Sequence, residues 1–264
     1  MESTDDLLVE QRGHVAILTL NRPQTLNALT NPMVDNLLAK LDECNDDPDL
    51  RVVIITGSGR GFCSGYDLKA GNIADVKRQS VYRMLDYENH WIARLRRFAK
   101  PTIAAVTGVA AGGGLGLALG CDLRIAADNA KFSAIFANIG MPPQDAAGAL
   151  LPQVVGISKA LEMIFTAKMV ESEEALRIGL ANEVAPTDQL IDRAMAIADR
   201  IASLPPVAIA MAKQTVLRGY GKSLDDQLAY QNLGSFLNAG YATEDLKEAV
   251  TAFKEKRKPS FKGR

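Results

Sequence analysis

Three consecutive glycines, Gly112 to Gly114, follow an apolar run at residues 102–106 and lead into an apolar segment that ends at Gly120. Each glycine inside a helix costs about 0.5–1 kcal/mol relative to alanine, because its backbone loses more conformational freedom on folding. Backbone N–H groups at a helix N-terminus carry partial positive charge and favour an oxygen that carries negative charge. We therefore hypothesise that this turn binds a developing oxyanion.

A second glycine turn, Gly65-Tyr66, comes after another apolar run at residues 51–56. If the two runs are neighbouring strands, one backbone N–H from each turn can converge on a single carbonyl oxygen. Such a pair stabilises an enolate or a tetrahedral oxyanion, and removing one donor typically costs about 2.7–4 kcal/mol of transition-state stabilisation. Two other interpretations stay open. The glycines could serve close helix–sheet packing, or they could bind a dinucleotide phosphate, although the spacing after Gly112 departs from the G-x-G-x-x-G pattern.

The composition bounds the class of protein. The chain has 264 residues, is 47% hydrophobic and 23% charged, and carries a formal net charge of −1. This length allows one large domain, or one domain with an appendage. The balanced charge argues against nucleic acid as a partner, and no apolar run reaches the roughly 18 residues that span a bilayer.

Cysteine and histidine are scarce, with three scattered cysteines and two histidines. Their spacing offers neither a disulfide framework nor a His-rich metal site. The acidic N-terminal residues fit neither a secretory signal nor a transit peptide. We therefore expect a cytoplasmic protein with no metal, no membrane attachment and no nucleic-acid partner.

The elements that position the glycine turns alternate between strand and helix. The run 15–20 predicts a strand, and Asn31-Pro32 predicts a helix start with Asn31 as its N-cap. Apolar residues at helical spacing follow as far as Leu41. The β-branched run 51–56 predicts a strand buried on both faces. Strand, helix and strand in this order give parallel pairing and an α/β layout.

The rest of the chain continues this pattern and then becomes helical. We predict a long helix at 73–98, strands at 102–106 and 122–126, an irregular segment at 132–149, and helices alone beyond about residue 185. We therefore expect a core at residues 1–199 and a C-terminal helical appendage at residues 200–264. Appendages of this kind often serve assembly.

Several segments together resemble the enoyl-CoA hydratase/isomerase (crotonase) superfamily, and the similarity runs through nearly the whole chain. They are residues 20–29, 53–57, 62–68, 100–114 and 121–126, with the ending at 253–264. The resemblance implies a crotonase-like α/β fold, a spiral of ββα turns with residues 200–264 as a helical trimerisation region. It also implies assembly as a homo-trimer or a hexamer.

The resemblance further implies an acyl-CoA substrate, with coenzyme A as part of the substrate and no separate cofactor. The thioester oxygen would be held by the N–H groups of Tyr66 and Gly113. The backbone from Ser64 to Lys69 would line the path of the pantetheine and adenine groups.

Side chains of the same region complete the expected CoA site. Arg22, Lys69 and the basic C-terminal tail, from this or a neighbouring subunit, could meet the CoA phosphates. Each of these cations taken singly could also be a solvated surface residue. Leu68 belongs to the same binding segment. Asp67 is common at its position in the family, so a structural role is expected for it.

Two catalytic carboxylates of the family's hydratases are absent. Their positions correspond to Gly116 and Phe136, and neither side chain can transfer a proton. The resemblance therefore implies that hydration by the two-glutamate mechanism does not operate. A glycine and a phenylalanine at these pocket-lining positions suggest an enlarged apolar pocket, suited to an alicyclic or aromatic acyl group.

Asp145 is the first candidate for a replacement acid/base. Related isomerases and a few hydrolytic or dehalogenating relatives place an acid in this loop, one residue earlier, where this chain has Gln144. The alternative is an N-cap for the helix expected at residues 146–151, because aspartate is a favoured cap. His90 could act as a general base, since imidazole titrates near neutral pH, or it could be a packing or surface residue.

The resemblance thus predicts an acyl-CoA enzyme of the enoyl-CoA hydratase/isomerase type that stabilises a thioester enolate. Isomerisation, or other enolate chemistry with a single acid/base, is favoured. Hydrolysis or C–C cleavage of a ring or β-keto thioester is an alternative. A non-catalytic CoA-binding or RNA-binding role is another, and the balanced charge argues against RNA.

Overall fold

The computed structural model describes residues 1, 3–69, 90–232 and 241–264. Its main element is a six-stranded sheet in the order β1-β2-β3-β4-β6-β9. Only β1 is antiparallel to its neighbour, and the other strands pair in parallel. The strands are β1 (Leu7–Arg12), β2 (Val15–Leu20), β3 (Val52–Gly57), β4 (Thr102–Val106), β6 (Leu123–Ala127) and β9 (Glu183–Ala185).

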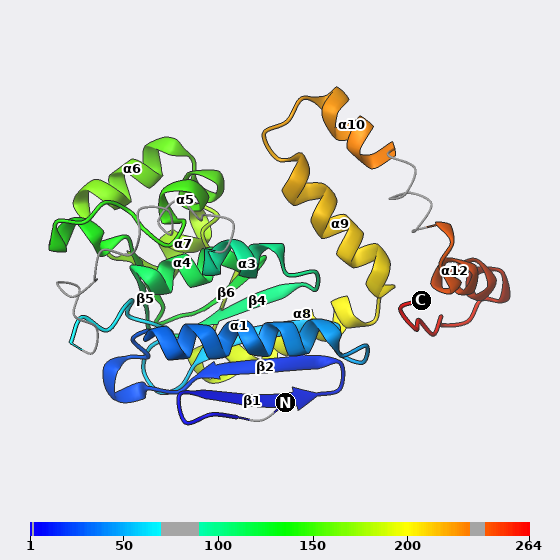
Figure 1. Ribbon diagram of the computed structural model, residues 1–264, viewed down its shortest axis with the longest axis horizontal. Coiled ribbons are helices and arrows are strands. Elements are labelled where there is room, and N and C mark those ends of the chain that lie inside the picture. Colours follow the sequence, from blue (N-terminus) through cyan, green and yellow to red (C-terminus); the bar gives the residue numbers. More distant parts are fainter. Residues whose placement is uncertain (2, 70–89, 233–240) are drawn as a thin grey trace.

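Helices cover both faces of this sheet (Figure 1). One face carries the larger core cluster, beneath α1 (Asn31–Asp46), α3 (Trp91–Arg97) and α4 (Gly113–Gly120). The other face is covered by α8 (Leu190–Ala202), which buries a stripe of leucine and alanine side chains against the sheet. Because both faces are covered, β3 and β4 are buried almost throughout.

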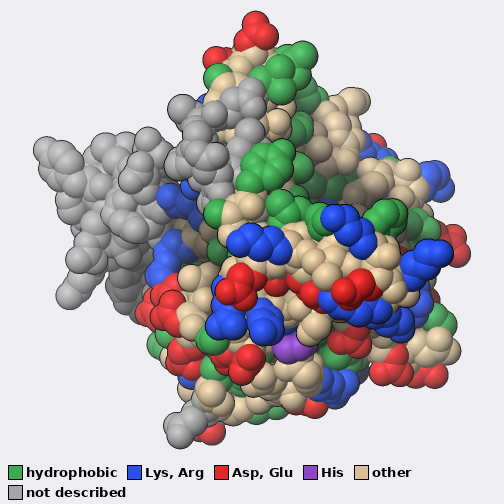
Figure 2. All heavy atoms as spheres, turned by 90° about the vertical axis from the view of Figure 1, so that its right-hand side faces the viewer, with side chains coloured by type: hydrophobic (Ala, Val, Ile, Leu, Met, Phe, Trp, Pro, Cys, Tyr) green, Lys and Arg blue, Asp and Glu red, His purple; other side chains and the backbone are tan. Residues whose placement is uncertain are grey.

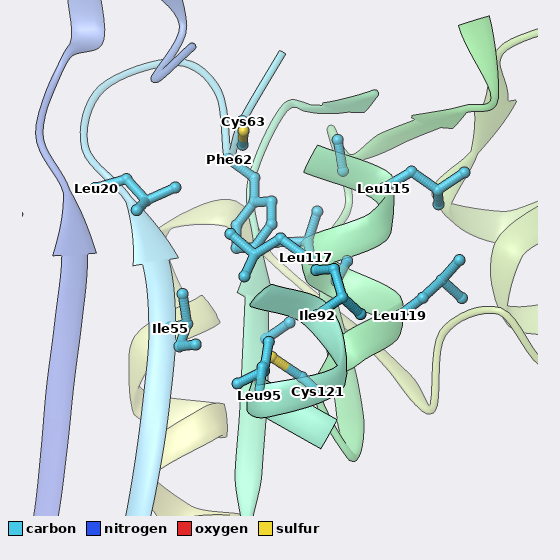
Figure 3. Close-up of a cluster of buried hydrophobic side chains, with 14 of the residues drawn as sticks. Leu20, Ile55, Phe62, Cys63, Ile92, Leu95, Leu115, Leu117, Leu119 and Cys121 are labelled. Atoms are coloured by element: carbon cyan, nitrogen blue, oxygen red, sulfur yellow. The ribbon is translucent and has the colours of Figure 1, made fainter. Parts of the chain in front are cut away.

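The glycine-rich helix α4 lies in the middle of the larger core. Figure 3 shows its Leu117 and Leu119 among buried side chains that include Ile92 and Leu95 of α3. An ideal Cβ on Gly120 would lie 2.8 Å from Leu95, so α3 and α4 approach too closely for a side chain there. Gly120 therefore serves close packing of α4 against α3. The packing interpretation of the sequence concerned Gly112 to Gly114, and Gly114 supports it, because an ideal Cβ there would overlap the Cys63 carbonyl oxygen.

A second, three-stranded sheet packs beside the first, in the order β5-β7-β8. It consists of β5 (Val109–Ala111), β7 (Lys131–Ser133) and β8 (Val170–Glu171). Two of the long strands, β4 and β6, are each followed by a short strand of the second sheet and then by a helix, in the orders β4-β5-α4 and β6-β7 before α5 (Ala147–Val155). This repeat is the predicted spiral of ββα turns, and the crotonase fold is confirmed.

Smaller helices and turns complete the described part of the chain. They are η1 (Pro23–Thr25), η3 (Ile135–Ile139), α6 (Ile157–Thr166), α7 (Ser172–Arg177) and η4 (Thr187–Gln189). Of these, α6 and α7 lie at the upper left of Figure 1.

The chain ends in helices that extend away from the sheets: α9 (Pro206–Gly219), α10 (Leu224–Asn232) and α12 (Glu244–Glu255) (Figure 1). Every described element after β9 is helical, as expected. The expected domain boundary at residue 199 falls inside α8, whose Ala202 is still buried against the sheet. The division into core and appendage stays a prediction.

Local differences from the sequence predictions have physical reasons. The N-cap of α1 is Thr30, whose hydroxyl accepts a hydrogen bond from Met33 N at 3.3 Å, and Asn31 is already helical. The short strand β5 was missed because three residues beside Gly108 and Gly112 give too short a pattern. The predicted helix at 73–98 lies outside the described residues up to residue 89.

No single helix in the described ranges is long and apolar enough to cross a membrane. One bent pair, 187–202 with 206–219, passes that test jointly, at an angle of 105°.

Candidate active site

The two glycine turns meet at one edge of the sheet. Strands β3 and β4 are parallel neighbours, so the loops after their carboxyl ends lie together. An ideal Cβ on Gly65 would lie 3.5 Å from Gly113 N and 3.0 Å from Ala111 O. Gly65 also has φ +103°, which a side chain would strain. A residue with a side chain would therefore separate the two turns.

The backbone N–H of Tyr66 points away from its bridge partner. Leu29 and Tyr66 form an isolated parallel bridge. Its hydrogen bonds run from Leu29 N to Gly65 O, at 2.8 Å, and from Asp67 N to Leu29 O, at 2.9 Å. In a parallel bridge of this kind the residue between the bonded groups directs its own N–H to the other side.

Gly113 supplies the second candidate N–H. It is the first residue of α4, and the preceding Gly112 N–H already donates to Ser133 O at 3.1 Å. The first hydrogen bond of the helix runs from Gly116 N to Gly112 O, at 3.0 Å. Within the described part of the chain, no hydrogen bond uses the N–H of Gly113, as is usual for a first-turn donor. The geometry supports the predicted pair of donors, Tyr66 and Gly113.

Asp145 lies against both Gly113 and Gly116. An ideal Cβ on Gly113 would lie 3.1 Å from Asp145 Oδ2. An ideal Cβ on Gly116 would lie 2.5 Å from the Asp145 carbonyl oxygen and 2.7 Å from its Cβ. The space that a side chain at residue 116 would need is therefore filled by Asp145. This corrects the expectation that Gly116 enlarges the pocket.

The backbone of Asp145 is strained. Asp145 and Ala146 have φ +50° and +57°, in the left-handed region that residues with side chains rarely occupy. Helix α5 begins at Ala147 with Ala146 as its N-cap, and no side chain caps it. The N-cap alternative for Asp145 is therefore wrong. Strain of this kind clusters at functional sites, where the surrounding structure holds it in place.

The carboxyl group of Asp145 is buried, with 7% of the residue exposed. Its Oδ1 accepts a hydrogen bond from Trp91 Nε1 at 3.0 Å, and His90 Nε2 lies 3.9 Å from the same oxygen. Burial raises the pKa of Asp145 above the usual aspartate value, and the contacts to Trp91 and His90 oppose that shift. The group is thus suited to both taking up and returning a proton.

The Tyr66 ring packs beside Gly113, since an ideal Cβ there would lie 3.2 Å from Tyr66 Cδ2. Burial and then the charge of Asp145 raise the pKa of the Tyr66 phenol, so the phenol stays neutral. Phe136 belongs to the turn η3, is 5% exposed and lies in the larger core. The position contributes an apolar side chain and no proton donor.

Three of the residues expected to bind CoA, Arg22, Ser64 and Asp67, contact other parts of the protein. Arg22 Nη2 lies 2.8 Å from Asp67 Oδ2, and Nη1 donates to Ala28 O at 2.6 Å. Asp67 therefore makes a structural contact, as expected. Through these two contacts Arg22 links the loop that contains Ala28 to the loop that contains Asp67. Ser64 donates its hydroxyl to Thr25 O at 3.0 Å.

Leu68 and Lys69 are exposed beside this loop. The roles of these residues and of Arg22 toward CoA stay predictions. Sequence analysis missed Trp91 as the partner of Asp145, because 54 residues separate the two and neither motif points to the other. In the described residues no cluster of histidine, cysteine and acidic side chains is arranged to hold a metal ion.

The fold and the glycine turns are those of a crotonase-type protein, and comparison with known proteins identifies the family. Residues 10–264 match the enoyl-CoA hydratase/isomerase family model, so the chain belongs to this family. It is 38% identical over 257 residues to the probable enoyl-CoA hydratase of Mycobacterium bovis, covering 97% of this chain and 98% of the relative. It is 37% identical to the short-chain-enoyl-CoA hydratase of Clostridium acetobutylicum, over 98% of this chain and 99% of that protein.

A solved structure agrees with these sequence relatives. The crystal structure of an enoyl-CoA hydratase from Bacillus anthracis matches with a TM-score of 0.90 at 32% identity, covering 98% of this chain and 100% of that one. The chain is therefore a crotonase-family acyl-CoA enzyme of the enoyl-CoA hydratase type.

Proposed function

We propose that this enzyme forms a thioester enolate from an acyl-CoA, with Asp145 as the acid/base. The N–H groups of Tyr66 and Gly113 hold the thioester oxygen, and Asp145 removes and returns a proton on the acyl chain. When the proton returns to a different carbon, the double bond moves. Among the reactions of this family, isomerisation is therefore the one that we favour for this enzyme.

The observation that carries this proposal is the place of Asp145. Its carboxyl group is buried beside Gly113, and its backbone fills the space next to Gly116. By resemblance, residues 116 and 136 are the positions of the two hydratase glutamates, and here they are glycine and phenylalanine. A single carboxylate from the loop before α5 thus serves the site in place of two, which supports proton shuttling over addition of water.

The experiment is isotope exchange in deuterated water with a panel of acyl-CoAs, including 2-enoyl, 3-enoyl and alicyclic thioesters. Deuterium should enter at the α or γ carbon with the wild-type enzyme. Exchange should fall by at least a hundredfold in Asp145→Ala and Asp145→Asn. Asp199→Asn, an exposed aspartate of α8 on the other face of the sheet, is the matched control.

Full exchange in Asp145→Ala would remove the assignment. Release of free CoA thiol in the same incubations would instead favour thioester hydrolysis, and water addition to a 2-enoyl-CoA would favour hydration.

We also propose that the chain assembles as a homo-trimer or a hexamer through its C-terminal helices. Exposed apolar side chains on α9, α10 and α12, and at the C-cap of α9, support this: Val216, Tyr220, Leu224, Leu228, Val250 and Phe253. Figure 2, which views the right-hand side of Figure 1, shows hydrophobic side chains gathered above a region of intermixed acidic and basic ones. Light scattering on the purified protein measures the assembly directly.

A further inference from the structure

The two oxygens of Asp145 have different surroundings. Oδ1 accepts the indole N–H of Trp91 at 3.0 Å and lies 3.9 Å from His90 Nε2. Oδ2 lies on the side of Gly113, 3.1 Å from the position of an ideal Cβ on that residue. Considering only the residues that the structure describes, no hydrogen bond is donated to Oδ2. One oxygen is therefore held, and the other faces the candidate oxyanion donors.

One hydrogen bond of the His90 ring indicates which nitrogen carries the proton when the ring is neutral. Ile92 N donates to His90 Nδ1 at 3.3 Å, so the imidazole side chain is the N-cap of α3. A neutral imidazole has one donor and one acceptor nitrogen, and an acceptor Nδ1 leaves the proton on Nε2. That nitrogen is the one directed at Asp145 Oδ1. Nε2 lies 3.9 Å from Oδ1, so its N–H faces the carboxylate from beyond direct hydrogen-bond distance, and Nε2 presents no lone pair there to act as a base.

We propose that Trp91 and His90 are positioning residues that hold Asp145 by Oδ1 and leave Oδ2 as the oxygen that exchanges a proton with the substrate. This inference rests on the proposed function of Asp145. The torsion that turns a carboxyl group is broad and two-fold, so an unheld aspartate would present either oxygen in many orientations. A donor on one oxygen restricts that rotation.

The proton transfer then follows a defined path. An α C–H bond of the acyl group breaks, and the proton forms an O–H bond on Oδ2. The electron pair of the C–H bond moves into the enolate, whose oxygen is held by the N–H groups of Tyr66 and Gly113. In a 3-enoyl thioester this enolate is conjugated with the β,γ double bond. Return of the proton from Oδ2 to the α carbon regenerates the substrate, whereas its return to the γ carbon moves the double bond to the α,β position, and either step restores the carboxylate.

A pair of substitutions at His90 separates its two contacts. Asparagine is a favoured N-cap, so His90→Asn keeps an acceptor for Ile92 N but is too short to reach Asp145. His90→Gln has an amide N–H at about the reach of Nε2 and is a poorer cap. Arg94→Gln is the matched control on α3, because Arg94 makes an exposed ion pair with Asp42.

A positioning role predicts that substitutions lower kcat and leave KM almost unchanged. Relative to Arg94→Gln, we expect kcat for exchange to fall roughly tenfold to a hundredfold in His90→Asn and Trp91→Phe, the scale at which misplacing a catalytic group costs rate. KM should change by less than about threefold. His90→Gln should recover part of the loss seen in His90→Asn, although it is the poorer cap. A purely structural role for His90 predicts the reverse order.

Trp91 is the only tryptophan of the chain, so its fluorescence reports the Oδ1 contact without any substrate. We expect the emission maximum to shift in Asp145→Ala relative to wild type and to stay in place in Arg94→Gln. This measurement remains available if Trp91→Phe fails to fold.

The outcomes separate this inference from the proposed function. An unchanged emission maximum in Asp145→Ala, or a wild-type kcat in both His90→Asn and a folded Trp91→Phe, overturns the positioning role. If Asp145→Ala has lost exchange in the same experiments, the proposed function stands. Retained exchange in Asp145→Ala overturns the proposed function, and the positioning role with it.

Discussion

The packing of Gly116 against Asp145 gives a sharp test, because one methyl group should displace the carboxylate. In Gly116→Ala the new Cβ would lie 2.5 Å from the Asp145 carbonyl oxygen, whereas ordinary contacts begin at 3.4 Å. The two groups must separate by about 0.9 Å, and the nearest atom is a backbone oxygen, which no side-chain rotation can move away. A displacement of about 1 Å at a catalytic group costs roughly a hundredfold in rate.

The same substitution should have a small effect on stability. Alanine gains about 0.5–1 kcal/mol over glycine inside a helix. Inserting a methyl group into a filled space typically costs about 1–3 kcal/mol. We therefore expect Gly116→Ala to lower the free energy of unfolding by no more than about 2.5 kcal/mol. Activity should fall far more than stability, which is the signature of a displaced catalytic group in a folded enzyme.

The assay is exchange of acyl-CoA protons with deuterated water, alongside urea unfolding. Gly148→Ala is the matched control, since its ideal Cβ lies 3.6 Å from Pro143 and meets only ordinary contact. Gly148→Ala should keep wild-type exchange. If Gly116→Ala exchanges at the wild-type rate with unchanged stability, Asp145 does not occupy that space in solution.

Four further predictions concern charge and assembly. Burial raises the folded-state pKa of Asp145, so ionising it disfavours the folded state as pH rises through that value; Asp145→Asn should raise the Tm at pH 7 and change it little below pH 3, by calorimetry. Exchange should fall as pH drops through the same raised pKa, and an acid limb at or below the usual aspartate range would contradict this. Arg22→Met breaks the Arg22–Asp67 pair, whose side chains are only 15% and 11% exposed, and should cost about 2–3 kcal/mol in urea unfolding, whereas Arg12→Met at an exposed pair should cost under about 1 kcal/mol. Phe253→Ser, at a side chain 85% exposed, should reduce the assembly size in light scattering; an unchanged mass would place the interface elsewhere.

Much of the fold follows from patterns that are local in sequence. Continuous apolar runs indicate buried strands clearly in an α/β layout. The strand predicted at 102–106 therefore has the observed bounds, and the strand predicted at 51–56 differs from β3 by one residue at each end. The cap of α1 was misassigned by one residue, since Thr30, Asn31 and Pro32 in succession all carry helix-start signals. Such errors leave the sheet order and the two glycine turns intact.

The role that we propose for Asp145 could not be predicted in the same way. A loop aspartate just before a helix has the same local pattern whether it caps that helix or faces a pocket. The choice depends on the left-handed backbone at Asp145 and Ala146, and on the indole of Trp91, which comes from a distant element. Neither is encoded by spacing within the loop.

The absence of a side chain at Gly116 and the left-handed backbone at Asp145 depend on each other. A glutamate at this position would reach the site from helix α4, with its Cβ in the space that Asp145 occupies. The loop before α5 can bring a carboxylate to Gly113 only if residue 116 has no Cβ, and it adopts two consecutive left-handed residues to do so. The two carboxylates are therefore mutually exclusive in this backbone. For that reason the glycine supports the proposed change of chemistry, and we expect a substitution at residue 116 alone to displace Asp145 before it supplies a hydratase-type glutamate.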